Sequence, residues 1–196
     1  PERFFGGVSW SGPFVRPLLY FLIVVILAST LGLFWFVWGP RGPAVFGLAL
    51  EIQLLSFFLT PFAVLVALGV VTLALHLFVV LLVPDRQGIA ATATVLCYGS
   101  GVSLVSAVFP PALGMSGSAT GVLGAAYLVF YASLTVAVQV WYIVVLVIGI
   151  RRAHATTTGR AAAIVLLPVV IGAVIVAAIA ITAVVLLPLL PGLVLP

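Results

Sequence analysis

Few residues in this chain carry side chains that take part in acid–base chemistry or ligand binding. The acids are Glu2, Glu51 and Asp85, and the imidazoles are His76 and His154. The sequence has no HExxH, CxxC, P-loop or GxSxG pattern, so it lacks the basic parts of metalloprotease, redox, nucleotide-binding and hydrolase sites. We therefore predict that the protein is not an enzyme, with no catalytic residue, no metal site and no cofactor required by a motif.

The strongest candidate for a functional residue is His76, which lies inside a long apolar run. If such a run crosses a membrane, a polar side chain inside it costs free energy and is often functional. A neutral imidazole there can ligate a haem or a chlorophyll-type pigment, which makes His76 the candidate cofactor-binding residue. The favoured interpretation is simpler, a hydrogen bond to a serine or threonine of the next apolar run. Gln139, deep in a later run, is a second residue that can face His76.

Basic residues cluster where another apolar run ends. Arg151, Arg152 and Arg160 flank this turn, and His154 lies between them. We expect His154 to act as a cation that complements the negative end of a helix. The arginines are candidates for binding anionic lipid headgroups or a partner, at about 1 kcal/mol per charge. Glu51 is the candidate partner-binding or ion-binding residue at the opposite end, although an interfacial helix with solvated polar groups is the favoured explanation.

The composition identifies lipid as the solvent of this chain. Hydrophobic residues make up 65% of the sequence and charged residues only 5%, with a mean hydropathy of +1.49. A soluble domain is about a quarter charged. The net charge of +4 comes from arginines at the edges of apolar runs, a pattern that sets membrane topology and gives no reason to expect nucleic acid as a partner. The single cysteine, Cys97, excludes an intramolecular disulfide within this sequence.

Five apolar runs are long enough to cross a bilayer. The predicted fold class is an all-α membrane bundle of about five transmembrane helices, with its N-terminus in the cytoplasm. Residues 44–60 form either a short surface helix or an early extension of the second span, with Glu51 near an interface. The third run is rich in small residues and should be buried among the others. We predict an interfacial segment over residues 1–16, spans over 17–38, 61–83, 89–113, 121–150 and 161–190, and a tail over 191–196.

The orientation follows from the arginines. With five spans, one side of the membrane holds six arginines and the other side only Arg41. Because positive charge stays on the cytoplasmic side, this split places the N-terminus in the cytoplasm and the C-terminus outside. The six arginines of the cytoplasmic side are Arg3, Arg16, Arg86, Arg151, Arg152 and Arg160.

An ordered set of landmarks resembles the Yip1 domain family of five-span membrane proteins, especially its bacterial members. The set begins with His76-Leu77, Ala91-Thr92 and Cys97-Tyr98-Gly99-Ser100, and continues with Pro110, Trp141, Ile150-Arg151-Arg152-Ala153-His154, Thr157 and Arg160-Ala161. The resemblance covers residues 61–168. A Gly-Gly pair that is frequent in the family is replaced here by Pro84-Asp85-Arg86-Gln87-Gly88. The resemblance implies a five-helix topology with the N-terminus in the cytoplasm and a scaffold or interaction role, with no catalytic residue.

Three hypotheses for function follow. The first is a non-catalytic scaffold or accessory subunit in a bacterial cytoplasmic membrane, with the lipid bilayer and other membrane proteins of a larger complex as partners. The second is a transporter or channel for a small solute or lipid. The third is a pigment-binding or haem-binding subunit of an energy-converting complex, through His76.

Overall fold

The computed structural model describes residues 4–5, 7–8, 10, 14–38, 48–109 and 122–186. Five helical stretches in these residues are long and apolar enough to cross a membrane, which confirms the predicted all-α class and fits an integral membrane protein. The third stretch is composite, since α4 continues through the 3-10 turn η2 into α5. The elements are α2 (Val15–Trp38), α3 (Leu48–Leu82), α4 (Ile89–Gly99), η2 (Ser100–Ser103), α5 (Leu104–Ala107), α6 (Val122–Ala153) and α7 (Thr158–Leu186).

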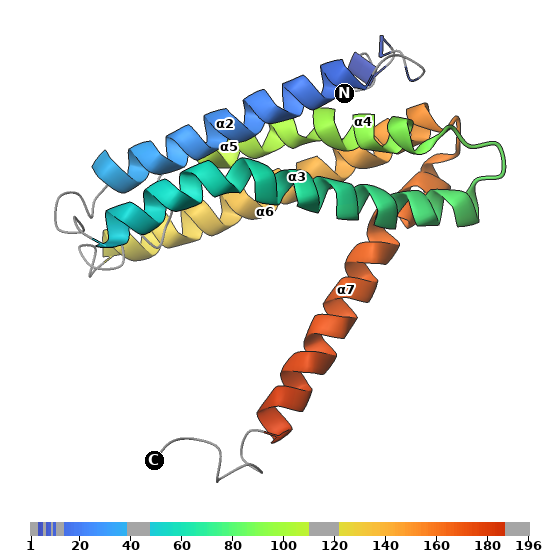
Figure 1. Ribbon diagram of the computed structural model, residues 1–196. Helices are drawn as coiled ribbons and strands as arrows, with labels where there is room; N and C mark the ends of the chain where they lie inside the picture. Colours follow the sequence, from blue (N-terminus) through green and yellow to red (C-terminus); the bar gives the residue numbers. More distant parts are fainter. Residues whose placement is uncertain are drawn as a thin grey trace.

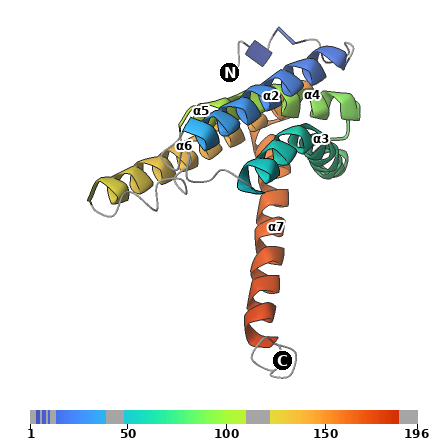
Figure 2. The same cartoon turned by 60° about the vertical axis from the view of Figure 1, so that its left-hand side comes forward.

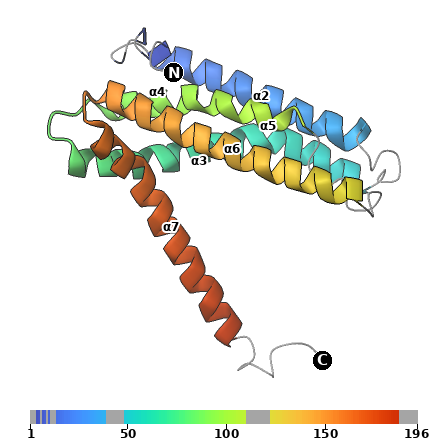
Figure 3. The ribbon, with the colours of Figure 1, turned by 180° about the vertical axis from the view of Figure 1, so that it is seen from behind.

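Four of the five stretches lie side by side. Figure 1 shows α2, α3, α4–α5 and α6 as an elongated bundle, and Figure 3 shows the same arrangement from behind. The fifth, α7, starts against α3 and α6 and then departs from the bundle at a wide angle. The start of α2, the α3–α4 turn and the α6–α7 turn meet at one end of the bundle. These segments carry Arg16, Arg86, Arg151, Arg152 and Arg160, and we call this end the arginine-rich end.

The helix at the centre of the bundle is α4. All residues from Ala91 to Cys97 are buried, and 44% of the α4–α5 stretch is buried against 11% to 22% of the other four. This helix contacts α2, α3 and α6. Its alanines and glycine let the neighbouring backbones approach, as the small-residue composition predicted.

One close approach is between α4 and α6. A Cβ atom added to Gly149 would lie 2.5 Å from Cγ1 of Val95 and 3.2 Å from Cζ of Phe5. Only glycine leaves room for this contact. Phe5 itself is 2% exposed and stacks on Trp10, with ring centroids 6.0 Å apart. The described part of the N-terminal segment is therefore packed onto the arginine-rich end of the bundle.

The second span is longer than the predicted 61–83. Helix α3 starts at Leu48 and continues through Pro61 to Leu82, so the described residues before Pro61 extend the span and do not form a separate surface helix. In lipid a helix that stopped at Pro61 would leave backbone groups without partners, which favours continuation. With 35 residues, α3 is about 50 Å long and exceeds a hydrocarbon core of about 30 Å. Glu51, exposed in its first turn, lies at the end away from the arginine-rich end.

The other helices begin and end within a few residues of the predicted spans. The first starts at Val15, the fourth ends at Ala153, and the fifth starts at Thr158. Arg3, Arg41, the predicted tail over 191–196 and the predicted ends of the third and fifth spans lie outside the described residues.

Candidate functional site at the arginine-rich end

Two histidines and a threonine from three segments meet inside the arginine-rich end. Nδ1 of His76 on α3 lies 3.0 Å from the hydroxyl oxygen of Thr92 on α4. The same hydroxyl lies 3.0 Å from Nε2 of His154 in the α6–α7 turn. We call this chain of two hydrogen bonds the histidine bridge. It joins α3, α4 and the α6–α7 turn through side chains alone.

The position of His154 depends on how α6 ends. The amide of His154 still donates to the carbonyl of Ile150, and the amide of Thr156 reaches back to the carbonyl of Arg151. Between them Ala155 has a positive φ of 48°, the left-handed conformation that commonly terminates helices. This turn directs the chain into α7 and leaves the imidazole of His154 beneath α4.

His154 is buried, and burial disfavours its charged form, so the predicted role as a cation at the helix end is wrong. The residue is only 1% exposed. Burial, followed by the nearby ring of His76, lowers the pKa of His154 from 6.5 to about 4. Its position in the turn lies outside the membrane-spanning helices. A charged imidazole would lose its hydration at this position, so burial favours the uncharged form.

The histidine bridge has two possible directions. A hydroxyl carries one proton, so Thr92 donates to one imidazole and must accept from the other. If His76 donates to Thr92, then Thr92 donates to Nε2 of His154, and Nδ1 of His154 carries a proton. In the opposite direction Nδ1 of His154 is a bare lone pair. Among the described residues this nitrogen is buried without a hydrogen-bond partner in either case.

A cavity of about 340 Å³ lies beside His154. Thr156 also lines it, and its hydroxyl oxygen is the second buried polar atom that lacks a partner among the described residues. Asp85 and Arg160 bring opposite charges to the same walls. The remaining lining residues are Val83, Pro84, Ala155 and Thr157.

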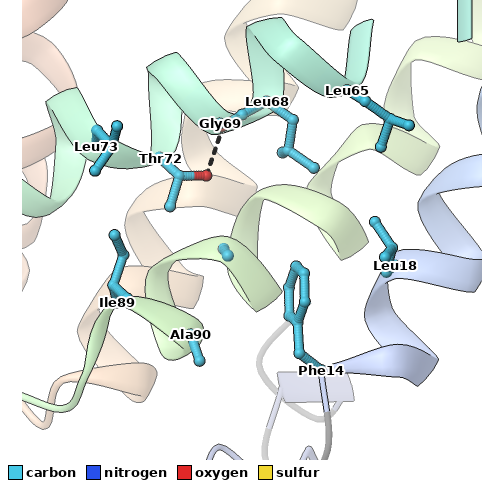
Figure 4. A pocket seen from close by; sticks show the side chains of 10 residues that line it. Phe14, Leu18, Leu65, Leu68, Gly69, Thr72, Leu73, Ile89 and Ala90 are labelled. Carbon is cyan, nitrogen blue, oxygen red and sulfur yellow. Dashed lines mark hydrogen bonds between the residues drawn. The ribbon is translucent and has the colours of Figure 1, made fainter. Parts of the chain in front are cut away.

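A second pocket is almost entirely apolar. It has a volume of about 460 Å³ and lies between α2, α3 and α4, as Figure 4 shows. Its one hydroxyl, that of Thr72, donates to the carbonyl of Leu68 at 2.6 Å and has no proton left for a ligand. The pocket therefore offers a surface for hydrocarbon only. Phe14, Leu18, Leu65, Gly69, Leu73, Ile89, Ala90 and Ala93 complete its walls.

The structure brings together only some of the residues singled out from the sequence. His76 makes the hydrogen bond expected to a threonine of the third span. Arg160 lines the cavity beside His154, whereas Arg151 and Arg152 line a neighbouring one of about 390 Å³. The guanidinium of Arg151 also donates to the hydroxyl of Thr158 at 3.3 Å.

Gln139 and Glu51 lie away from the histidine bridge. Gln139 is exposed in the middle part of α6, so the suggested pairing with His76 is absent from the described structure. Glu51 lies near the opposite end of α3. Within the described ranges, no group of three or more histidine, cysteine and acidic side chains can hold a metal ion.

Sequence reasoning did not single out Thr92, Thr156 or Asp85 as site residues. Thr92 lies in the first helical turn of the third span, and its polar side chain there was the available signal. Comparison with protein-family models, with curated proteins and with solved structures gives no match to this chain. The geometry of the described residues therefore carries the functional argument.

Proposed function

We propose that this chain is a non-catalytic integral membrane protein that binds other membrane proteins, as a scaffold or accessory subunit. The observation that carries the proposal is the exposure of α7 beyond Pro168. From Val169 to Thr182 every residue is exposed except Gly172, which is partly buried. Figure 2 shows this part of α7 standing clear of the bundle. Up to Thr182, the buried residues of α7 are all in its first turns, at Ala161, Ile164 and Val165.

The exposed part of α7 has the composition of a helix–helix interface. Ala173, Ala177 and Ala180 follow one another at intervals of four and three residues and share one face of the helix. Small residues at such spacing let a second membrane helix approach closely, because packing rather than hydrophobicity drives association in lipid. Larger residues such as Ile175 occupy the opposite face.

The rest of the molecule is in keeping with an interaction role. The histidine bridge uses the polar groups of His76 and Thr92 in contacts between elements of the same chain. The resemblance to the Yip1 domain family, with its scaffold role, points in the same direction. We further propose a bacterial cytoplasmic membrane as the location, from the arginine distribution and the bacterial character of that resemblance.

Purification from native membrane in a mild detergent tests the proposal. The full chain is expected to appear in light scattering as a particle heavier than its own 20.4 kDa plus bound detergent, with a reproducible accompanying membrane protein. Ala177→Ile should remove the partner by filling the small-residue face, whereas Ile175→Phe, on the opposite face, should leave it bound. A strictly monomeric particle with no accompanying protein would overturn the proposal.

A further inference from the structure

The cavity beside His154 has the features of a binding site for a phosphate group. It contains a buried imidazole nitrogen and a buried hydroxyl, both without partners among the described residues. A buried polar atom without a hydrogen bond is destabilising, so two at one cavity indicate a ligand group that satisfies both.

The start of α7 adds positive charge to the cavity. The hydroxyl of Thr157 accepts the amide of Arg160 at 3.4 Å and caps the helix, which leaves other first-turn amides available to an anion. Helix α7 has 29 residues, and its N-terminus carries a partial positive charge. Arg160, exposed at the rim, supplies a full charge.

The histidine bridge can supply a donor to the same place. Nε2 of His154 is taken by Thr92, so Nδ1 is the polar atom that this ring has left for the cavity. When His76 donates to Thr92 and Thr92 donates to His154, Nδ1 of His154 bears a hydrogen. An acceptor in the cavity selects this direction of the bridge.

Asp85 adds a negative charge to the site, so the site selects for more than an anion. Its carboxylate lines the cavity together with Arg160, and within the described part of the chain no ion pair joins the two side chains. Arg160 and Asp85 together complement a ligand that carries a negative and a donor group. Its phosphate would face Arg160, and its hydrogen-bond donor would face Asp85. An ammonium or hydroxyl group on the alcohol of a phosphate ester meets this requirement.

We propose that the cavity formed by His154, Thr156, Arg160 and Asp85 binds a phosphate ester whose alcohol carries an ammonium or hydroxyl group, as in a phospholipid headgroup. The α3–α4 and α6–α7 turns that form it lie at the ends of apolar spans, where headgroups are found. The inference is independent of any partner on α7, since that surface begins beyond Pro168.

The test uses the full chain in neutral detergent micelles. Bound lipid is measured by native mass spectrometry with dioleoylphosphatidylethanolamine, with dioleoylphosphatidylcholine, whose choline lacks N–H donors, and with dioleoylglycerol, which lacks phosphate. O-phosphoethanolamine is titrated separately as the free headgroup. Binding of the ethanolamine lipid but not the free ester assigns the site to membrane lipid. Comparable binding of the free ester assigns it to a soluble phosphate ester.

Matched variants decide whether the cavity is responsible. Arg160→Gln should weaken binding of the ethanolamine lipid about fivefold. Arg16→Gln, exposed at the same end but outside the cavity, should leave it unchanged. Asp85→Asn should abolish the preference for ethanolamine over choline. Equal losses in both arginine variants, or no binding of any phosphate-bearing probe, would overturn the proposal.

Discussion

The imidazole rings of His76 and His154 lie 6.2 Å apart, centroid to centroid, with the hydroxyl of Thr92 hydrogen-bonded to both. These rings belong to the second span and to the turn between the fourth and fifth spans. The bridge therefore ties three segments together at the one end of the bundle where α7 is also attached. The tautomer of each imidazole is coupled to that of the other, because the single hydroxyl proton of Thr92 sets the direction of both hydrogen bonds.

Thr92→Val should destabilise the folded state by about 1–2 kcal/mol, because it leaves two imidazole nitrogens without their shared partner at almost unchanged side-chain volume. The measurement is unfolding of the full chain in mixed micelles with increasing sodium dodecyl sulfate. Thr94→Val is the control, since the hydroxyl of Thr94 donates only to the carbonyl of Ala90 in its own helix. A loss of the same size in both variants would contradict the role of the bridge.

Stability should decrease as the pH falls from about 6.5 to about 4. The pKa of His154 is about 4 in the fold and 6.5 when unfolded, so the unfolded chain binds the extra proton first. The contribution of His154 is present above pH 6.5 and is lost through this window, with an upper bound on the order of 3 kcal/mol. Parallel unfolding series at pH 7 and pH 4.5 measure it.

His154→Gln provides the control for this pH dependence. The variant removes the titrating group, and Asp85, Arg160 and His76 remain around the cavity and the bridge. Its stability is expected to be lower than that of the unaltered chain at pH 7 but to change less between the two pH values. An unaltered slope in His154→Gln would assign the effect to another group.

The sequence was sufficient for the helices but not for the contacts between them. Apolar runs and arginine positions predicted five spans because hydrocarbon admits little other than continuous helices. The start of α3 at Leu48 was left open, since Pro61 is compatible with both a junction and a helix interior. The departure of α7 from the bundle has no signal in the sequence, because an apolar helix can pack against lipid as well as against its own bundle.

The sequence predicted the role of His76 in the candidate site but not that of His154. The depth of His76 in its apolar run predicted a hydrogen bond to a serine or threonine of the third span, and His76 lies 3.0 Å from the hydroxyl of Thr92. His154 was predicted to be a cation at the end of a helix, and local sequence does not reveal that the turn at Ala155 buries the ring against Thr92 on α4. The joining of His76 and His154 through Thr92 is a property of tertiary packing, since the three residues belong to different segments.

Gly149→Ala should destabilise the bundle by about 1–3 kcal/mol. The new methyl group would lie 2.5 Å from Val95 on α4 and 3.2 Å from the ring of Phe5. Because both neighbours are in contact, α4 and α6 would have to separate. Gly32→Ala on α2 is the control, because an added Cβ there meets no atom within 4 Å. Unfolding in mixed micelles compares the two, and equal stability of both variants would contradict the close approach.

Labelling of engineered cysteines should place Gln87 and Thr157 on one face of the membrane and Trp38 on the other. Gln87 and Thr157 are exposed in turns at the arginine-rich end, whereas Trp38, 76% exposed, ends α2 at the far end of the bundle. Native Cys97 gives little background because it is fully buried. An impermeant maleimide applied to intact cells should modify Trp38→Cys alone, and all three variants after permeabilisation. Arginine retention and the family resemblance are the basis for the orientation, so modification of Gln87→Cys but not Trp38→Cys from outside would invert the topology. Opposite faces for Gln87 and Thr157 would exclude five spans.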